Sequence, residues 1–520
     1  MVAKLGMSEE RFLALGASPH TPHGFNMTCL ALRGSRFHNG VSRIHGRVAS
    51  EMEAHLWPQI PPAENPLGYV TNGVFLCSML GPSWLALLEM YLGRGWRSRL
   101  TDEAFWHGVI DGIPDHVYLS TRQILKLHMI DYIRSHATLL YRRNGLTESE
   151  IDHLTRFLTS ASINTLFIGF ARRFATYKRA GLVLRDLTRL ARIVSDPERP
   201  VIFVFAGKAH PADRPGQELV RQIYEISMRP EFQGRVLMLE DYSLAMARIL
   251  LPGVDVWLNN PEYPLEACGT SGMKAAINGG VNLSVLDGWW AEAYDGENGW
   301  AITPHPELPA HARDAREAGE LLDLIEEQVV PLFYARNAAG EPAAWVKKSK
   351  ASMKTILPRY NGIRMCMDYL REFYAPAIRH SNALSLGDGR GASNLAAWKK
   401  RVAAAWTGVR LRFASEPPAA IRAGDPLPLE VAVQLNGLDA SDVVVECLAG
   451  RENDVEGFVT VSSITLEPKG RETEGEMIFV ADLRGCSDLP LEGLRQFRVR
   501  IYPFHPLLAH RFECGCMVWL

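Results

Sequence analysis

The chain has 520 residues, more than one hydrophobic core usually serves, so we expect two to four domains. Its 56 basic and 58 acidic residues leave a net charge of -2, which argues against nucleic acid or a membrane surface as the main partner. No apolar run approaches the roughly 18 residues of a membrane-spanning helix, and the N-terminus lacks the apolar core of a signal peptide. These features predict a soluble protein of the cytoplasm.

The chain contains eight cysteines scattered over its length. In a chain of this size, such scatter favours reduced thiols over a disulfide framework, in agreement with a cytoplasmic location. Cys514 and Cys516 have the spacing of one face of a strand, but two lone ligands are a weak metal signal and buried thiols are the better interpretation. We therefore expect no metal site.

The first part of the chain mixes helical and extended patterns up to a proline cluster at 58–62, which predicts a boundary before residue 68. From there to about residue 380, helical segments alternate with short apolar strands. Such strands are typical of a parallel sheet covered on both faces, so we predict a doubly wound, Rossmann-like α/β fold whose ligands bind beyond the carboxyl ends of the strands. The predicted strands are 166–170, 201–205, 235–239, 254–258 and 281–286.

A phosphate-binding arrangement follows the predicted strand at 254–258. The small-residue loop at 266–272 runs into a predicted helix, so glycine N–H groups and the hydroxyls of Thr270 and Ser271 can approach an anion beside Lys274. A nucleotide-binding P-loop is a weaker interpretation, because it requires Ser or Thr after the lysine and Ala275 stands there. Taken alone, the loop is equally compatible with an ordinary start of a helix that binds no ligand.

A second cationic loop follows the predicted strand at 166–170. Arg173 and Lys178 place two cations at the mouth of the sheet, which suits a dianion such as phosphate. A solvated basic helix start is the alternative interpretation. Two other residues also allow two interpretations: Asn72, before a glycine, suits a turn as well as a ligand contact, and Tyr242 suits the core as well as a site.

The pattern changes in the C-terminal part of the chain. A polar segment with several glycines and serines at 381–393 predicts a linker, followed by a helix that ends near residue 407. From residue 408, alternating strands at 427–435, 479–483 and 497–502 predict a small β-sandwich-like domain that extends to residue 520.

The nonapeptide Glu266-Ala-Cys-Gly-Thr-Ser-Gly-Met-Lys274 resembles the cofactor-lysine loop of the pyridoxal-phosphate-dependent α-glucan phosphorylases. The segments 278–292 and 297–302 resemble their short bacterial and archaeal branch. The resemblance covers roughly residues 20–405, and the tail resembles the C-terminal region of short-branch members. It implies part of a two-lobed, GT-B type glycosyltransferase: a remnant of the N-terminal lobe and crossover at 1–67, a catalytic Rossmann-like lobe at 68–380, a linker and helix at 381–407, and a β-sandwich-like domain at 408–520.

The resemblance also implies roles for individual residues. Lys274 carries pyridoxal 5′-phosphate in this scheme, and Arg173 and Lys178 act with it in catalysis by holding the substrate phosphate. Arg172 and Cys268 stand where many members have lysine and serine, so charge is kept at the first position and hydrogen bonding is weakened at the second. The implied cofactor-binding residues are Lys274, Gly269, Thr270, Ser271, Gly272, Arg172 and Tyr242, and the implied sugar-binding residues are Glu266, Cys268 and Asn72.

The activity implied is retaining phosphorolysis of terminal α-1,4-linked glucose from glycogen or maltodextrin, which yields glucose 1-phosphate. The implied partners are an α-glucan and inorganic phosphate, without nucleic acid or membrane. A homo-oligomer or a separate N-terminal lobe is a further expected partner. The separate lobe follows from the resemblance, which predicts that the chain lacks most of that lobe. Two other functions stay open: a catalytically incomplete remnant that binds cofactor or glucan, and a nucleotide-sugar glycosyltransferase, against which the cofactor motif argues.

Overall fold

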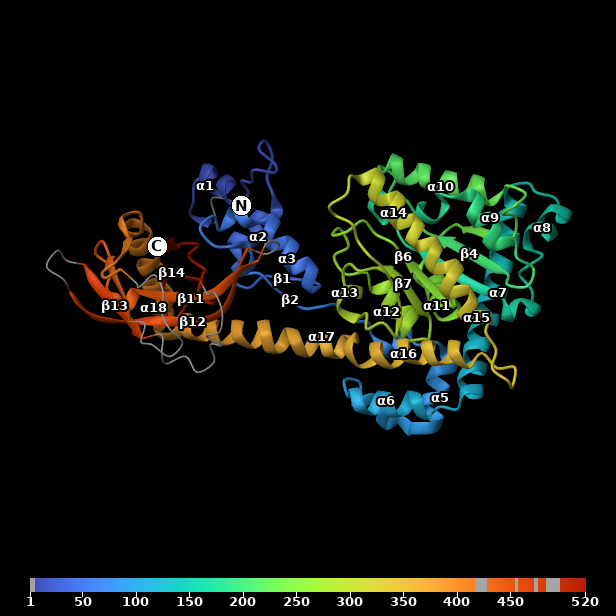
Figure 1. Cartoon of the computed structure of the whole chain (residues 1–520). Helices are drawn as coiled ribbons and strands as arrows, with labels where there is room; N and C mark the ends of the chain where they lie inside the picture. Colours follow the sequence, from blue (N-terminus) through green and yellow to red (C-terminus); the bar gives the residue numbers. More distant parts are fainter. Residues whose placement is uncertain (1–4, 417–427, 454–456, 472–475, 483–495) are drawn as a thin grey trace. The chain divides into compact units, whose positions relative to one another are not determined.

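The computed structural model describes residues 5–416, 428–453, 457–471, 476–482 and 496–520 (Figure 1). The chain divides into two compact units. One consists of Gly40–Gly46 and Tyr69–Tyr369, and the other consists of Met1–Asn39, Arg47–Gly68 and Leu370–Leu520. Within the described ranges, every helix is too short or too polar to cross a membrane.

A six-stranded parallel sheet forms the centre of the unit that contains Tyr69–Tyr369. The strands occur in the order β5-β4-β3-β6-β7-β8, so the chain connections reverse direction between β3 and β6, as in doubly wound folds. The apolar pattern predicts five of these strands correctly and does not predict β8. The strands are β3 (Leu166–Ala171), β4 (Val201–Ala206), β5 (Val236–Leu239), β6 (Val256–Asn259), β7 (Val281–Val285) and β8 (Gly299–Ile302).

Successive side chains of each strand point to opposite faces of the sheet. Both faces are buried, each against its own set of helices. Ile168 of β3 lies in a core with helices α9, α10 and α14, and Phe167 lies in another core with α7 and α11. Burial on two sides explains why the strands read as apolar runs. These helices are α7 (Asp115–Arg143), α9 (Leu187–Ser195), α10 (Arg214–Ser227), α11 (Leu244–Gly253) and α14 (Ala310–Asp323).

Further helices complete this unit, which has a third core that is rich in tryptophan and includes Trp84, Trp106 and Trp289. Met273, next to the predicted cofactor lysine, is fully buried in the same core, so the loop before it is anchored by packing. The helices are α4 (Leu76–Met79), α5 (Pro82–Leu92), α6 (Glu103–Gly112), α8 (Glu148–Thr155), α12 (Thr270–Ala276), α13 (Trp290–Ala293), α15 (Val330–Tyr334), α16 (Ala343–Arg359) and α17 (Gly362–Asp368).

The other unit contains a seven-stranded antiparallel sheet in the order β15-β14-β11-β12-β13-β10-β9. The long strand β12 joins two groups of strands, because it pairs with β11 along its first part and with β13 along its second. The sandwich-like arrangement of these groups stays a prediction. Residues 427 and 483 of the predicted strands lie outside the described ranges. The strands are β9 (Arg410–Phe413), β10 (Pro428–Gln434), β11 (Val443–Asn453), β12 (Gly457–Arg471), β13 (Met477–Asp482), β14 (Gln496–Pro503) and β15 (Val518–Trp519).

Three helices of this unit are α1 (Glu9–Leu15), α2 (Met27–Gly34) and α18 (Ala375–Ala405). The segment 381–393, predicted as a linker, lies within α18 and is non-helical only at Leu386, Gly387, Asp388 and Gly389. Gly387 and Gly389 have φ values of 62° and 81°, which glycine adopts without steric cost. The glycines therefore break a helix here, and the second half of α18 packs on the core of the antiparallel sheet.

Candidate active site

The candidate site lies at the carboxyl edge of the parallel sheet, where β3 and β6 are neighbours. Arg172 and Arg173 directly follow β3, and Asn260 directly follows β6. The chain leaves these two strands in opposite directions, and ligands of doubly wound sheets bind at such a switch point. The two loops that the sequence singles out therefore meet where a ligand is expected.

Glu266 joins the two loops through ion pairs. Its carboxylate accepts hydrogen bonds from Arg172 Nη2, at 2.5 Å, and from Lys178 Nζ, and both Glu266 and Lys178 are buried. Burial alone raises the pKa of Glu266, but the charges of Arg172 and Lys178 outweigh this effect and hold that pKa below its ordinary value. Glu266 is therefore ionised, and an anion that enters must compete with it for both cations.

Arg172 also contacts the end of β6. Its Nη1 donates to Asn259 Oδ1, whereas its Nε is buried and has no hydrogen-bond partner among the described residues. An unsatisfied buried donor of this kind costs about 1–3 kcal/mol unless a ligand supplies an acceptor. Burial raises the pKa of the nearby Tyr242 to about 12, against the opposing charge of Arg172. The Tyr242 hydroxyl is therefore a neutral hydrogen-bond donor at physiological pH.

The glycine loop before α12 has a backbone suited to an anion. Gly269 adopts φ 88° and ψ 55°, a left-handed conformation that favours glycine, and it provides no side-chain cap for α12. The N–H groups of the first turn are therefore available to a ligand. Gly272 packs so closely against β7 that a Cβ atom would lie 2.4 Å from Asn282 Oδ1, so a larger residue would displace the loop.

Hydroxyl groups occupy the first turn of α12 at Thr270 and Ser271, and both residues are half-buried. Ser271 Oγ accepts a hydrogen bond from Trp257 Nε1 at 3.2 Å. This contact orients Ser271 and leaves its hydroxyl proton free to donate to an anion.

Lys274 lies one turn after Thr270 on α12, and its side chain is half-buried. In the described part of the chain, the ammonium group of Lys274 forms no ion pair or hydrogen bond. Burial lowers the pKa of Lys274, and no carboxylate in the described chain pairs with the ammonium group to raise it again. A lysine in this environment holds more neutral, nucleophilic amine at a given pH than an exposed lysine does.

Lys274 is therefore expected to react with a small aldehyde at lower pH than an exposed lysine. Neutral amine accumulates as the pH rises through the pKa, so the midpoint of labelling by glycolaldehyde and borohydride should fall below about 10.4, the ordinary lysine value. Mass spectrometry of the labelled peptides measures this midpoint, with the exposed Lys347 as the internal control. A Lys274 midpoint at or above that of Lys347 would contradict the assignment of a reactive amine.

Arg173, Asn72 and Cys268 complete the predicted set. Arg173 is exposed, and its guanidinium has no hydrogen bond or ion pair within the described ranges, so it remains available to an anion. Cys268 is buried next to the backbone of Asn72, and burial raises the pKa of its thiol to about 12. Asn72 is half-buried, and its carbonyl accepts a hydrogen bond from Arg364 Nη2 at 3.1 Å. Asn72 and Cys268 are therefore brought together, with the thiol neutral.

Asp287 is a buried carboxylate of this edge to which the sequence motifs assign no role. Its Oδ2 accepts a hydrogen bond from the Glu266 N–H at 3.0 Å, and its Oδ1 accepts one from the Gly288 N–H at 2.7 Å. Burial raises the pKa of Asp287 to about 6, although these two hydrogen bonds oppose the shift. Its place just after a predicted strand, at the ligand edge of the sheet, is the signal that could have indicated it.

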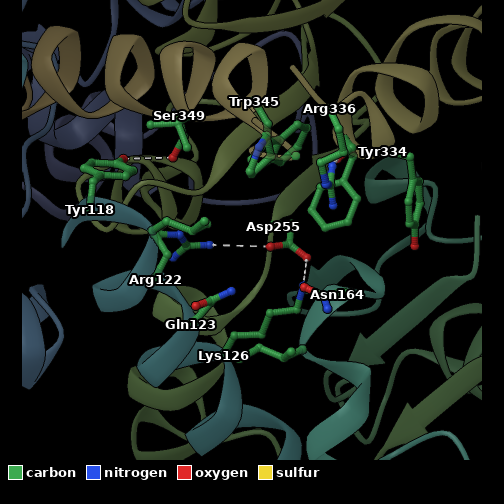
Figure 2. Close-up of a pocket in the computed structure, with 16 residues that line it drawn as sticks. Tyr118, Arg122, Gln123, Lys126, Asn164, Asp255, Tyr334, Arg336, Trp345 and Ser349 are labelled. Carbon is green, nitrogen blue, oxygen red and sulfur yellow. Dashed lines mark hydrogen bonds and ion pairs between the residues drawn. The ribbon is translucent and has the colours of Figure 1, made fainter. Parts of the chain in front are cut away.

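A separate cavity of about 470 Å³ lies at the opposite, amino end of the sheet (Figure 2). Asp255, which directly precedes β6, forms an ion pair with Lys126 Nζ at 2.6 Å and lies 4.0 Å from Arg122 Nη2. Lys126 also donates to Thr165 O at 2.5 Å, and Arg122 donates to Val254 O at 2.6 Å. These groups satisfy one another, so this cavity is bordered by an ion network that fastens α7 to the sheet.

The sheet order defines a doubly wound α/β protein, with cations gathered at its switch point. The carbohydrate phosphorylase family matches residues 17–295, and the glycogen phosphorylase C-terminal domain matches residues 406–520. The chain belongs to the carbohydrate phosphorylase family, which confirms the resemblance seen in the sequence.

Several curated relatives are phosphorylases. Maltodextrin phosphorylase of Thermococcus litoralis is 38% identical over 521 residues, covering 99% of this chain and 59% of the relative. Glycogen phosphorylase of Mycobacterium tuberculosis is 37% identical over 514 residues, with 98% and 58% covered. Glycogen phosphorylase of Aquifex aeolicus is 39% identical over 375 residues, with 72% and 53% covered. The chain therefore spans less than two thirds of the length of these relatives.

Proposed function

We propose that this chain carries the cofactor-binding catalytic lobe of an α-glucan phosphorylase. The reaction cleaves the terminal α-1,4-linked glucose of glycogen or maltodextrin with inorganic phosphate and releases glucose 1-phosphate with retained configuration. The main supporting observation is the half-buried Lys274, without an ion-pair partner in the described chain, on the glycine loop at the sheet's switch point. An amine in this position beside clustered cations suits an aldehyde cofactor that bears a phosphate.

The residues of this edge fit pyridoxal 5′-phosphate. Lys274 offers the amine that would hold the cofactor, Arg172 offers a buried Nε that lacks a partner among the described residues, and Tyr242 offers a neutral hydroxyl. When bound, the cofactor supplies a phosphate that can exchange a proton with the substrate phosphate. The donors proposed for the cofactor phosphate are the N–H and hydroxyl groups of Gly269, Thr270, Ser271 and Gly272.

Arg173 and Lys178 are proposed to hold the substrate phosphate. Arg173 is exposed and free to do so, whereas Lys178 must first weaken its ion pair with Glu266. A carboxylate released in this way becomes available to a sugar hydroxyl, so phosphate binding and glucose binding are coupled through Glu266. The two cations then hold negative charge next to the glucosyl ring as positive charge develops on it. Asn72 and Cys268 are proposed to contact further sugar hydroxyls.

The family assignment supports further proposals about organisation. The lobe at 68–380 would act in a GT-B type arrangement, with residues 1–67 as the crossover and the segments 381–407 and 408–520 appended. The substrates would be cytoplasmic α-glucan and inorganic phosphate.

Arg173→Gln is expected to weaken phosphate binding with little effect on stability, because Arg173 is exposed and has no partner in the described chain. Loss of a charge-assisted contact worth about 1.5–3 kcal/mol predicts a roughly 10–150-fold decrease in kcat/KM for phosphate. Initial rates at varied phosphate and saturating maltodextrin measure this effect. Arg192→Gln, on the exposed side of α9, is the matched control and should leave the rates unchanged. Equal phosphate dependence in both variants would exclude Arg173 from the phosphate site.

A further inference from the structure

Three side chains of metal-ligand type meet in the unit that does not contain Lys274. They are Cys29 of α2, Glu53 just after α3 (Arg43–Met52) and His55 of the 3-10 turn Ala54–Leu56. Cys29 Sγ lies 3.8 Å from Glu53 Oε2 and 3.5 Å from His55 Nε2, and the latter two atoms are 3.9 Å apart. Cys29 is fully buried and Glu53 is nearly so, which places a thiol and a carboxyl group together away from water.

These spacings suit ligands of a single tetrahedral ion. Zinc bonds of about 2.0–2.3 Å at tetrahedral angles place sulfur, nitrogen and oxygen ligands roughly 3.3–3.6 Å apart. The 3.5 Å separation in this cluster falls within that range, and the 3.8 Å and 3.9 Å separations exceed it by a few tenths of an ångström. Closing the three side chains around an ion therefore requires only small movements.

Ordinary hydrogen bonding accounts for the cluster less well. The 3.9 Å between His55 Nε2 and Glu53 Oε2 is too long for a hydrogen bond, and the two contacts of the Cys29 thiol are weak ones. Buried polar groups are normally satisfied, so a cluster held this loosely indicates that a further component joins it.

We propose that Cys29, Glu53 and His55 bind one Zn²⁺ ion. Thiolate and imidazole ligands favour zinc over magnesium or calcium, and three protein ligands leave the fourth position to water. Water can reach it, because the side chain of His55 is 19% exposed. The nearby His20 is not a fourth ligand, since its Nε2 lies 3.1 Å from Met52 O, with which it forms a hydrogen bond. The ion braces α2 against the segment that follows α3, and the site has no part in the proposed phosphorolysis.

Titration of the chelator-treated full chain with Co²⁺ alone tests the site. Difference spectra are expected to show one equivalent of tetrahedral cobalt with a thiolate charge-transfer band, which one equivalent of Zn²⁺ displaces. Cys29→Ser should lose this band. Cys366→Ser, which removes an exposed thiol in the other unit, is the control and should retain it.

Glu53→Gln separates loss of the site from loss of the fold, because it keeps the thiol and nearly the same side-chain volume. A variant with an unchanged circular dichroism spectrum should bind Co²⁺ at least about tenfold more weakly. The proposal is overturned by an absence of stoichiometric binding, by unchanged affinity in Glu53→Gln, or by a band that persists in Cys29→Ser but disappears when Cys514 and Cys516 are replaced.

Discussion

Lys274→Ala is expected to abolish retention of pyridoxal phosphate and, as a result, to reduce phosphorolysis strongly. The side chain that disappears is the half-buried amine whose pKa burial lowers, and the remaining donors can bind the cofactor only without a covalent link. Loss of the cofactor's proton-transferring group predicts a decrease in kcat on the order of 10²–10⁴-fold. Gel filtration after incubation with the cofactor, followed by absorbance of the protein fraction, measures retention, and release of glucose 1-phosphate measures activity.

Lys347→Ala is the matched control for this experiment, since Lys347 is an exposed lysine of the same unit. It should retain one equivalent of cofactor. If the Lys274 variant retains cofactor as firmly as this control does, the assignment of Lys274 is wrong. Loss of cofactor together with the folded circular dichroism spectrum would show that the effect is local.

Asp255→Ala is expected to have the largest effect on stability. The substitution removes the carboxylate that lies 2.6 Å from Lys126 Nζ and 4.0 Å from Arg122 Nη2, and it leaves two cations buried without it. An uncompensated buried charge predicts a loss of about 3–5 kcal/mol in the free energy of unfolding. Urea denaturation followed by tryptophan fluorescence measures the change, and the large buried tryptophans of this unit make that signal sensitive.

Asp111→Ala provides the comparison, because Asp111 also pairs with a lysine, Lys354 at 2.9 Å, but its side chain is 55% exposed. Removal of such an exposed pair should cost no more than about 1 kcal/mol. Similar losses in the two variants would contradict the role of the buried network around Asp255.

The sequence predicts the parallel sheet well because its strands are buried on both faces and appear as apolar runs. The apolar pattern does not predict strand β8. This strand has only four residues, Gly299–Ile302, and its glycine and tryptophan do not form a β-branched run. In the C-terminal part, alternation identifies strands but not their partners. The strand order depends on the length of β12, which pairs with β11 along its first part and with β13 along its second.

The candidate site is predictable only where its residues lie close together in the sequence. The glycine loop and Lys274 form one motif, and Arg173 and Lys178 form another. The ion pairs of Glu266 with Arg172 and Lys178 join residues 94 and 88 positions apart, so local spacing contains no information about them. The motifs assign no role to Asp287, because its importance lies in a contact with the backbone of Glu266.

The most direct test of the central claim is the formation of glucose 1-phosphate by the purified chain. The chain is loaded with pyridoxal phosphate and incubated with maltodextrin, with and without inorganic phosphate. We expect glucose 1-phosphate only when phosphate is present, and far less of it from Lys274→Ala. A chain that retains one equivalent of cofactor yet forms no glucose 1-phosphate would contradict the claim and favour a cofactor-binding remnant.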